Sequence, residues 1–491
     1  MPSFRPALLA SLAPVALALA APAAAETLSG ALAKAYQTNP TITAARANQM
    51  ATDESVPIQK AASLPTAQIV STYNENVLIP GGQFVVIPRT LVSQGQLTVP
   101  IYQGGLVKFG IKAADARVKA GEEQLRGTES SVFSQVVSAY NDVLRDTAIV
   151  QLNRANVRNL EVNLRSTQDR FEVGDVTRTD VAQSEARLAQ ARADLRNAEA
   201  NLIGSKERYI QQVGEAPDEL APPPPLPGLP VSADEAVSVA VKENPDIAAA
   251  LKNSEAAGLD VKSSHAARLP VISGFGNLTR NDNFGGAIVP PGFPRQPSEQ
   301  TSGVIGARLT LPLFQGGRPA AQIRQAQARQ SAAMENQVAT ERSVVQQVRA
   351  AFASWKASLD VIKSAEAAIA ANGLSLQGVR AENSVGNRTI IEVLNAEQEL
   401  INAQVQLATA RRNAYVAGFT LLAAMGQAEA RDLDLGGVAL YDSRDNYNKV
   451  KGKFFDWDDR PGPKLHATST LNTPAQNANV PDSPAEPQPP Q

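Results

Sequence analysis

The residue types that most often carry out covalent chemistry are scarce in this chain. It has no cysteine and only two histidines, His265 and His466, which lie far apart in the sequence. These counts disfavour cysteine nucleophiles, thiolate or His-rich metal centres and Ser-His-Asp triads. The many carboxylates are scattered along helical faces, where solvation or ion pairing explains them. We therefore expect no enzyme activity, no cofactor and no metal site.

Two short polar motifs have the spacing that caps helices. Thr389 is followed three residues later by Glu392, which is the pattern of a capping box, and Asp180 suits the first turn of a helix. The chemistry available to these residues is hydrogen bonding and ion pairing. The elements that position them must therefore be helices that begin near residues 180 and 390.

The net charge of the chain disfavours a nucleic-acid-binding protein, and its first residues indicate export from the cytoplasm. Lysine and arginine total 46 against 48 acidic residues, so the basic excess of a nucleic-acid-binding protein is missing. Arg5, an apolar stretch and Ala23-Ala24-Ala25 follow the pattern of a signal peptide over residues 1–25. The longest later apolar run, Tyr415 to Met425, has 11 residues, which is too short for a transmembrane helix. We expect an exported chain without such a helix.

The chain reads as a tandem repeat. Asn39-Pro40 recurs as Asn244-Pro245, and the segment 97–105 recurs as 309–317 with the same Gly-Gly ending. The expected organisation is a first repeat (26–216), a Pro-rich linker (217–230), a second repeat (231–430), a C-terminal segment (431–460) that wraps the helices, and a disordered tail (461–491).

Each repeat predicts a long helical hairpin. No proline occurs from 101 to 216 or from 320 to 460, and residues 105–173 form one candidate helix about 100 Å long at 1.5 Å per residue. The returning segment has apolar residues every seven positions, which is typical of knobs-into-holes packing. These positions are Val181, Leu188, Leu195 and Leu202 in the first repeat and Val393, Leu400, Leu407 and Ala414 in the second.

A pair of strands is expected in each repeat, within 66–102 and 271–313. Apolar residues alternate with polar ones, for example Leu97 and Val99 with Gln96 and Thr98. This alternation suits a membrane β-barrel, yet four strands cannot close one and open edges are not tolerated in lipid. Three chains would supply twelve strands. The alternative is a small soluble sheet that caps a coiled coil.

These features resemble the TolC family of outer-membrane efflux and secretion proteins over residues 26–457. The resemblance rests on the Asn-Pro starts, the Pro-Leu-Phe-Gln-Gly-Gly step at 312–317, the Val-Gly turns and the run 385–394. It implies a mainly α-helical fold with a membrane portion: a homotrimer with a 12-stranded β-barrel in outer-membrane lipid and a 12-helix α-barrel. It also implies a periplasmic adaptor and an inner-membrane transporter, of the ABC type, as partners. The ending around Tyr441-Asp442 resembles type I secretion members.

The resemblance also implies roles for residues at the tips of the hairpins. Val173, Gly174, Val385 and Gly386 correspond to an adaptor-docking motif. This sequence departs from the family after each glycine, at Asp175 and Asn387, which leaves the choice of adaptor open.

The gate is assigned by the same resemblance. Thr179 and Asp180 from one repeat would face Arg388 from the other and latch neighbouring coils, and Glu392 would line the constriction. Asn383 and Asn395 depart from the family pattern, so we expect fewer latch bonds and a less acidic ring.

The leading hypothesis is a passive conduit that opens when the latch breaks and takes its energy from an inner-membrane partner. The alternatives are a periplasmic adaptor and a trimeric coiled-coil adhesin. Two copies of the hairpin-and-strand unit disfavour both. The cargo is not readable from the sequence, although the C-terminal ending slightly favours protein secretion over drug efflux.

Overall fold

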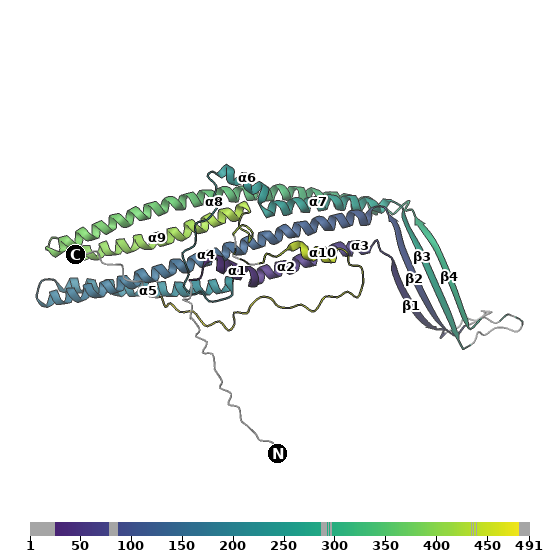
Figure 1. Ribbon diagram of the computed structural model, residues 1–491, viewed down its shortest axis with the longest axis horizontal. Coiled ribbons are helices and arrows are strands. Elements are labelled where there is room, and N and C mark those ends of the chain that lie inside the picture. The colour runs from purple at the N-terminus through teal and green to yellow at the C-terminus, as the bar shows by residue number, and fades with distance from the viewer. Residues whose placement is uncertain are drawn as a thin grey trace, which may run out of the picture.

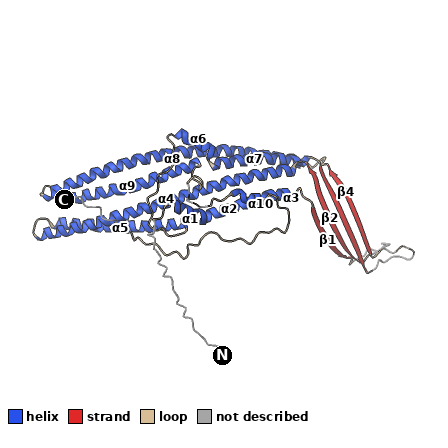
Figure 2. Ribbon diagram, in the orientation of Figure 1, coloured by secondary structure: helices blue, strands red, loops and turns tan. Residues whose placement is uncertain are grey.

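The computed structural model describes residues 25–480 except 78–86, 286–291, 293, 295–296, 434, 436 and 438. The expected signal peptide up to residue 24, the loop at 79–82 and the tail from 481 lie outside these residues. The described chain is an elongated body of helices with a four-stranded sheet at one end (Figures 1 and 2). The ends of two helical hairpins form the opposite extremity. The expected fold class, mainly α with a β portion, is confirmed.

Both repeats contain the same order of elements. The first has α1 (Leu28–Thr38), α2 (Pro40–Asp53), α3 (Ser55–Ala61), β1 (Thr66–Glu75), β2 (Arg89–Gln103), α4 (Leu106–Glu172) and α5 (Arg178–Val213). The second has α6 (Ala233–Glu243), α7 (Pro245–His265), the 3-10 turn η1 (Ala266–Arg268), β3 (Val271–Phe284), β4 (Glu299–Thr310), α8 (Arg318–Ser384) and α9 (Ile390–Met425). The short helix α10 (Ser443–Val450) follows.

The Asn-Pro pairs begin helices as expected. The Asn39 side chain accepts a hydrogen bond from the Thr41 backbone N–H at 2.9 Å, and Asn244 does the same for Asp246. The missing N–H of proline costs nothing at the first helical position. Each asparagine also ends a preceding helix, α1 or α6, which the sequence analysis did not separate.

The long helices α4 and α8 have 67 residues each, and each turns back into a 36-residue partner. The apolar seam between α4 and α5 is well buried; Leu188 and Leu202, for example, are 5% and 0% exposed. Larger side chains fill the core where α1 meets this hairpin. The largest that are almost completely buried are Phe133, Tyr140, Tyr209 and Phe419. None of the described helices contains an apolar stretch of the length that a membrane span requires.

The four strands form one antiparallel sheet in the order β1-β2-β3-β4. Register places Ala67, Leu97, Gly276 and Ile305 side by side on one face, and Ile305 is 93% exposed. The other face is mostly polar, with Val70, Val92, Phe275 and Val304 as apolar exceptions. There the Gln68 side chain donates to Gln96 at 2.7 Å.

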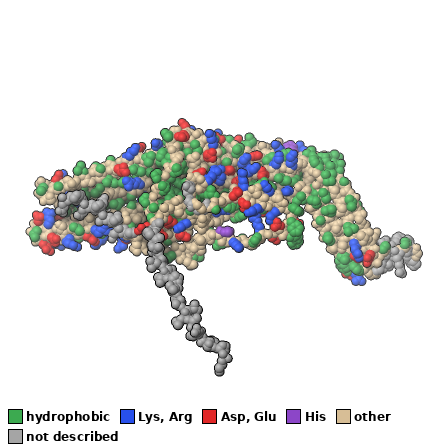
Figure 3. Space-filling view, in the orientation of Figure 1, with side chains coloured by type: hydrophobic (Ala, Val, Ile, Leu, Met, Phe, Trp, Pro, Cys, Tyr) green, Lys and Arg blue, Asp and Glu red, His purple; other side chains and the backbone are tan. Residues whose placement is uncertain are grey.

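The space-filling view shows hydrophobic side chains gathered on the sheet near the helices, whereas charged side chains are spread over the helical body (Figure 3). The sheet ends earlier than the alternation in the sequence extends. β4 stops at Thr310, before Leu311 and Leu313. Pro312 has no N–H to donate to a further ladder bond.

The Pro-rich linker lies against Glu26, shortly before α1. Glu26 pairs in parallel with Leu220, and the Tyr140 hydroxyl lies within hydrogen-bond distance of the carbonyls of Glu26 (2.8 Å) and Ala221 (2.6 Å). Burial raises the pKa of the Tyr140 hydroxyl, so it remains a neutral donor. The linker is thereby held against the middle of α4, next to the C-terminal end of α5.

Part of the tail for which we expect disorder, residues 461–480, lies within the described chain. Residues 461–480 have no regular secondary structure, but they run back along the helices and make specific contacts with α4 and α5. The composition predicts disorder because it supplies few core-forming side chains. The contacts are made largely through the main chain of the tail, which composition does not report.

Candidate gate at the hairpin tips

The two hairpin tips have the same backbone design. Gly174 and Gly386 both have φ +81°, and in each case the next residue donates its N–H back across the turn, Asp175 to Arg170 and Asn387 to Glu382. This is the Schellman ending, in which glycine adopts the left-handed conformation without steric cost. Val173 and Val385 are 80% and 70% exposed beside these glycines. The tips therefore present two similar exposed Val-Gly turns.

Each returning helix begins with a capping box. Asp180 accepts from the Thr177 N–H at 2.8 Å, and Glu392 accepts from the Thr389 N–H at 2.9 Å. Thr179 lies beside the first box on the exposed surface of α5. The spacing of Thr389 and Glu392 predicts the second box in full, whereas only Asp180 of the first box is predicted, as a first-turn residue.

Arg388 is engaged within its own hairpin. Its guanidinium donates to Glu382 at 2.7 Å and to Glu392 at 2.6 Å. The Thr389 backbone N–H, together with Arg388, lowers the pKa of the Glu392 carboxyl to about 2. Glu392 is thus anionic at neutral pH, and a neighbouring cation partly offsets its charge.

The structure of one chain does not bring Asp180 and Arg388 together. Among the described residues, the hydrogen-bond partners of Asp180 belong to its own capping box and those of Arg388 to its own turn. Two departures from the family pattern also have local partners. Asp175 pairs with Arg170 at 2.7 Å, and the Asn383 amide donates to the Arg388 carbonyl at 2.7 Å.

Near the tips the two hairpins are joined by residues that the sequence analysis missed. Glu397 on α9 is 5% exposed and accepts two hydrogen bonds from the Asn163 amide of α4, at 3.0 and 3.1 Å. It also accepts one from Arg380 of α8 at 2.6 Å. A buried carboxylate needs such partners, because desolvation without them is costly. We call Asn163, Arg380 and Glu397 the lower clamp.

A second hydrogen bond between the two hairpins lies next to the lower clamp. Arg187 of α5 donates to the Asn395 side chain of α9 at 2.6 Å. Apolar side chains from both hairpins pack in the same region, including Leu160, Leu188 and Leu394. Asn395 was singled out only as a lost acidic residue; the structure shows it as an acceptor between hairpins.

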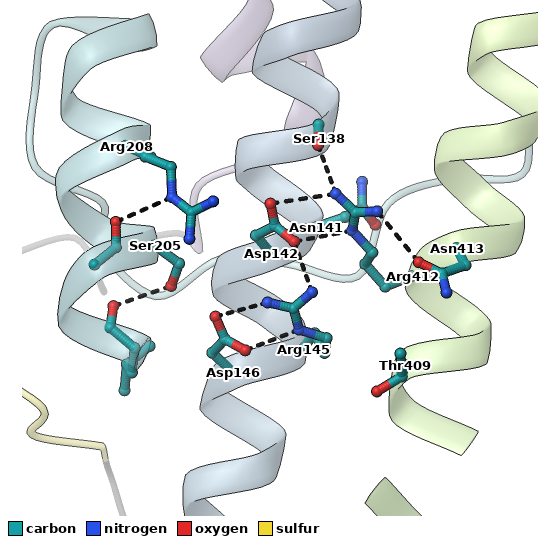
Figure 4. A network of polar contacts seen from close by, with 12 residues as sticks. Ser138, Asn141, Asp142, Arg145, Asp146, Ser205, Arg208, Thr409, Arg412 and Asn413 are labelled. Atoms are coloured by element: carbon teal, nitrogen blue, oxygen red, sulfur yellow. Dashed lines mark hydrogen bonds and ion pairs between the residues drawn. The ribbon is translucent and has the colours of Figure 1, made fainter. Parts of the chain in front are cut away.

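Further from the tips, a charged network joins α4 to α9 (Figure 4). Arg412 of α9 reaches across to Asp142 at 2.9 Å and Ser138 at 2.6 Å. Arg145 pairs with Asp142 and Asp146, both of which are buried. Two arginines and two aspartates balance their charges here. We call this group the upper network.

Comparison with known proteins identifies the family. The model of the outer membrane efflux protein family matches residues 31–214 and 236–427. Outer membrane efflux protein BepC of Brucella suis is 34% identical over 439 residues, covering 88% of this chain and 92% of BepC. Outer membrane protein TolC of Vibrio cholerae is 26% identical, covering 83% and 92%.

Two further matches widen the comparison. Alkaline protease secretion protein AprF of Pseudomonas aeruginosa is 26% identical, covering 65% of this chain and 66% of AprF. The CmeC outer membrane channel of Campylobacter jejuni superposes with a TM-score of 0.71 at 17% identity, covering 87% and 89% of the two chains. The last likeness concerns the fold alone.

The periplasmic adaptor and adhesin alternatives do not fit these matches. The family consists of outer-membrane channel proteins that are not enzymes, which confirms the expected class and location. This chain belongs to the outer membrane efflux protein family, the TolC family, and is an outer-membrane channel protein of a Gram-negative bacterium.

Proposed function

We propose that three copies of this chain form a single channel through the outer membrane and the periplasm. The observation that carries the proposal is the sheet, which has an apolar exposed face and a mostly polar opposite face. Within the described chain its two outer strands, β1 and β4, each pair with one neighbour and leave the other side unpaired. In lipid every backbone polar group needs a partner, so the outer strands must pair with other copies. Three copies make a barrel of twelve strands with its polar face inside.

The helical hairpins of the three copies would continue the barrel as a tunnel of twelve helices. At the tips we propose a closed gate, with the lower clamp holding the two hairpins of each chain together. Opening requires the clamp and the Arg187–Asn395 bond to break while the upper network remains as a pivot. We place the lower clamp among the contacts that break because it lies nearer the moving tip than the upper network does.

We further propose that the residues at the tips act between copies. Thr179 and Asp180 would meet Arg388 of a neighbouring coil, and Glu392 would contribute one negative charge per chain to the constriction. Arg388 would then exchange partners on closing. The Arg388 side chain is 46% exposed. Water can therefore replace a lost partner, and the exchange of ion pairs costs little free energy. The exposed Val173-Gly174 and Val385-Gly386 turns would receive a periplasmic adaptor.

The channel has no energy source of its own, and we propose that an inner-membrane transporter of the ABC type supplies it through the adaptor. BepC is an outer membrane efflux protein, TolC is an outer membrane protein, and AprF is an alkaline protease secretion protein. We therefore propose that small toxic compounds, secreted proteins or both pass through the tunnel.

The assembly is tested by the mass of the detergent-solubilised protein together with one pair of variants. The mass should equal three chains. Ile305→Arg places a charge on the apolar face and should prevent insertion into lipid vesicles, since a charge there costs about 2–4 kcal/mol per chain at the bilayer midplane. Ser302→Arg, on the polar face of the same strand, should insert normally. A monomeric mass, or normal insertion of both variants, would contradict the proposal.

A further inference from the structure

The end of the described tail, residues 468–480, lies along the α4/α5 hairpin, and we call it the strap. It starts at the C-terminal end of α5, where the Thr468 hydroxyl lies close above Gly214. It ends at Val480, which is 8% exposed and belongs to the core cluster that contains Val150 and Leu202. The strap therefore covers several turns of the hairpin on the way toward the tip.

Charged side chains of the hairpin bind the main chain of the strap. Arg154 of α4 donates to the carbonyls of Ala478 at 2.8 Å and Val480 at 3.1 Å. Lys206 of α5 donates to the Asn477 carbonyl at 2.9 Å, and Glu207 accepts from the Gln476 N–H at 3.0 Å. Hydrogen bonds in which one partner is charged are stronger than neutral ones. A polar, low-complexity segment can thus dock without a hydrophobic sequence of its own.

The strap contacts both helices of the hairpin at the same level. Arg154 comes from α4, whereas Lys206 and Glu207 come from α5, and Ala478 and Val480 pack on the core between the two helices. Arg154 also lies 3.6 Å from Glu199 of α5. Burial lowers the pKa of the Lys206 amine, which agrees with a covered position.

We propose that residues 468–480 dock on the α4/α5 hairpin of their own chain and clamp its two helices together between the middle of the molecule and the tip. The hairpin surface formed by Arg154, Lys206 and Glu207 is then a binding site for an extended polypeptide backbone. Release of the strap loosens the hairpin at this level. The proposal does not depend on the trimer, the gate or any transport partner.

Amide hydrogen exchange tests the clamp. A chain that ends at Arg460 should exchange about tenfold faster than the full chain at residues 146–157 and 198–210, because charge-assisted bonds and apolar cover are lost together. Exchange in the sheet should be unchanged. Lys206→Ala in the full chain should have the same effect to a smaller degree. Arg208→Ala is the matched control, since Arg208 bonds the Gly204 carbonyl of its own helix.

Equal exchange in the full and truncated chains would overturn the proposal, as would equal effects of Lys206→Ala and Arg208→Ala. Cysteine pairs test which chain supplies the strap, and the natural chain has no cysteine to interfere. A short bismaleimide reagent should cross-link Glu207→Cys to Gln476→Cys within one chain, because the Glu207 carboxylate and its hydrogen bond span a gap longer than a disulfide, and it should link Arg208→Cys to Gln476→Cys much less. A cross-link between chains would show a strap exchanged between copies, and no cross-link at all would refute the docked position.

Discussion

Glu397 provides the sharpest test of the gate, because one buried carboxylate joins three helices. Glu397→Gln keeps the size of the side chain and removes its charge. The hydrogen bond from Arg380 then loses its ionic component, and one of the two contacts with the Asn163 amide becomes a contact between two NH₂ groups or two oxygens. The clamp is weakened without a cavity being made.

The size of the effect follows from the exposure of the partners. The Glu397 side chain is 6% exposed, whereas that of Arg380 is 52% exposed, so Arg380 can recover water when its partner is neutralised. Hydrogen bonds to charged groups contribute about 1.5–3 kcal/mol, and the lower end applies here. About 1.5 kcal/mol per chain raises the open population of the tip roughly tenfold.

Planar-bilayer recording is the assay. Glu397→Gln should spend at least about tenfold more time in larger conductance steps than the natural protein, since each of the three proposed chains carries the change. The matched control is Glu399→Gln, an exposed position two residues further along the same helix, which should leave the record unchanged. If Glu397→Gln and Glu399→Gln behave alike, the lower clamp does not hold the tip closed.

Three further predictions concern the tips and the upper network. The lowered pKa of Glu392 means that the ionised carboxylate stabilises the second tip fully above pH 4.5, the ordinary value, and that this stabilisation is lost as the pH falls through about 2. An NMR titration of the Glu392 carboxyl should find a midpoint near 2. A midpoint near 4.5 would contradict the capping geometry. Gly174→Ala should increase amide exchange at the first tip about tenfold, because an L residue at positive φ costs about 1–2 kcal/mol. Gly373→Ala, inside α8, should not increase it. Arg412→Ala should lower the free energy of unfolding by about 2 kcal/mol, since Asp142 keeps Arg145 as a partner. Arg411→Ala removes only an exposed pair with Glu366 and should cost less than 1 kcal/mol by denaturant titration.

The features that sequence reasoning predicts well are those set by nearby residues. The helix starts at Asn39 and Asn244, the tip turns at Gly174 and Gly386 and the capping box of Glu392 each depend on residues within one or two turns. The length of α4 follows equally from a proline-free stretch with regular apolar spacing.

The features that it misses depend on distant partners. Glu397 and Asn163 are 234 positions apart, and nothing near either residue shows that they meet. Their contact is fixed by how one hairpin packs on the other, which periodicity does not specify. The contacts of Arg412 with Asp142 and of Arg154 with the strap are hidden for the same reason. The strap adds a second difficulty, because its binding uses backbone groups that every sequence contains.

The most direct test of the central account is the single-channel conductance of the purified natural protein in a planar bilayer. A closed tip held by the lower clamp predicts small, stable conductance steps. Large steps from the outset would contradict a gate that is closed in the isolated protein. A folded, helical sample that never inserts would contradict the outer-membrane channel itself.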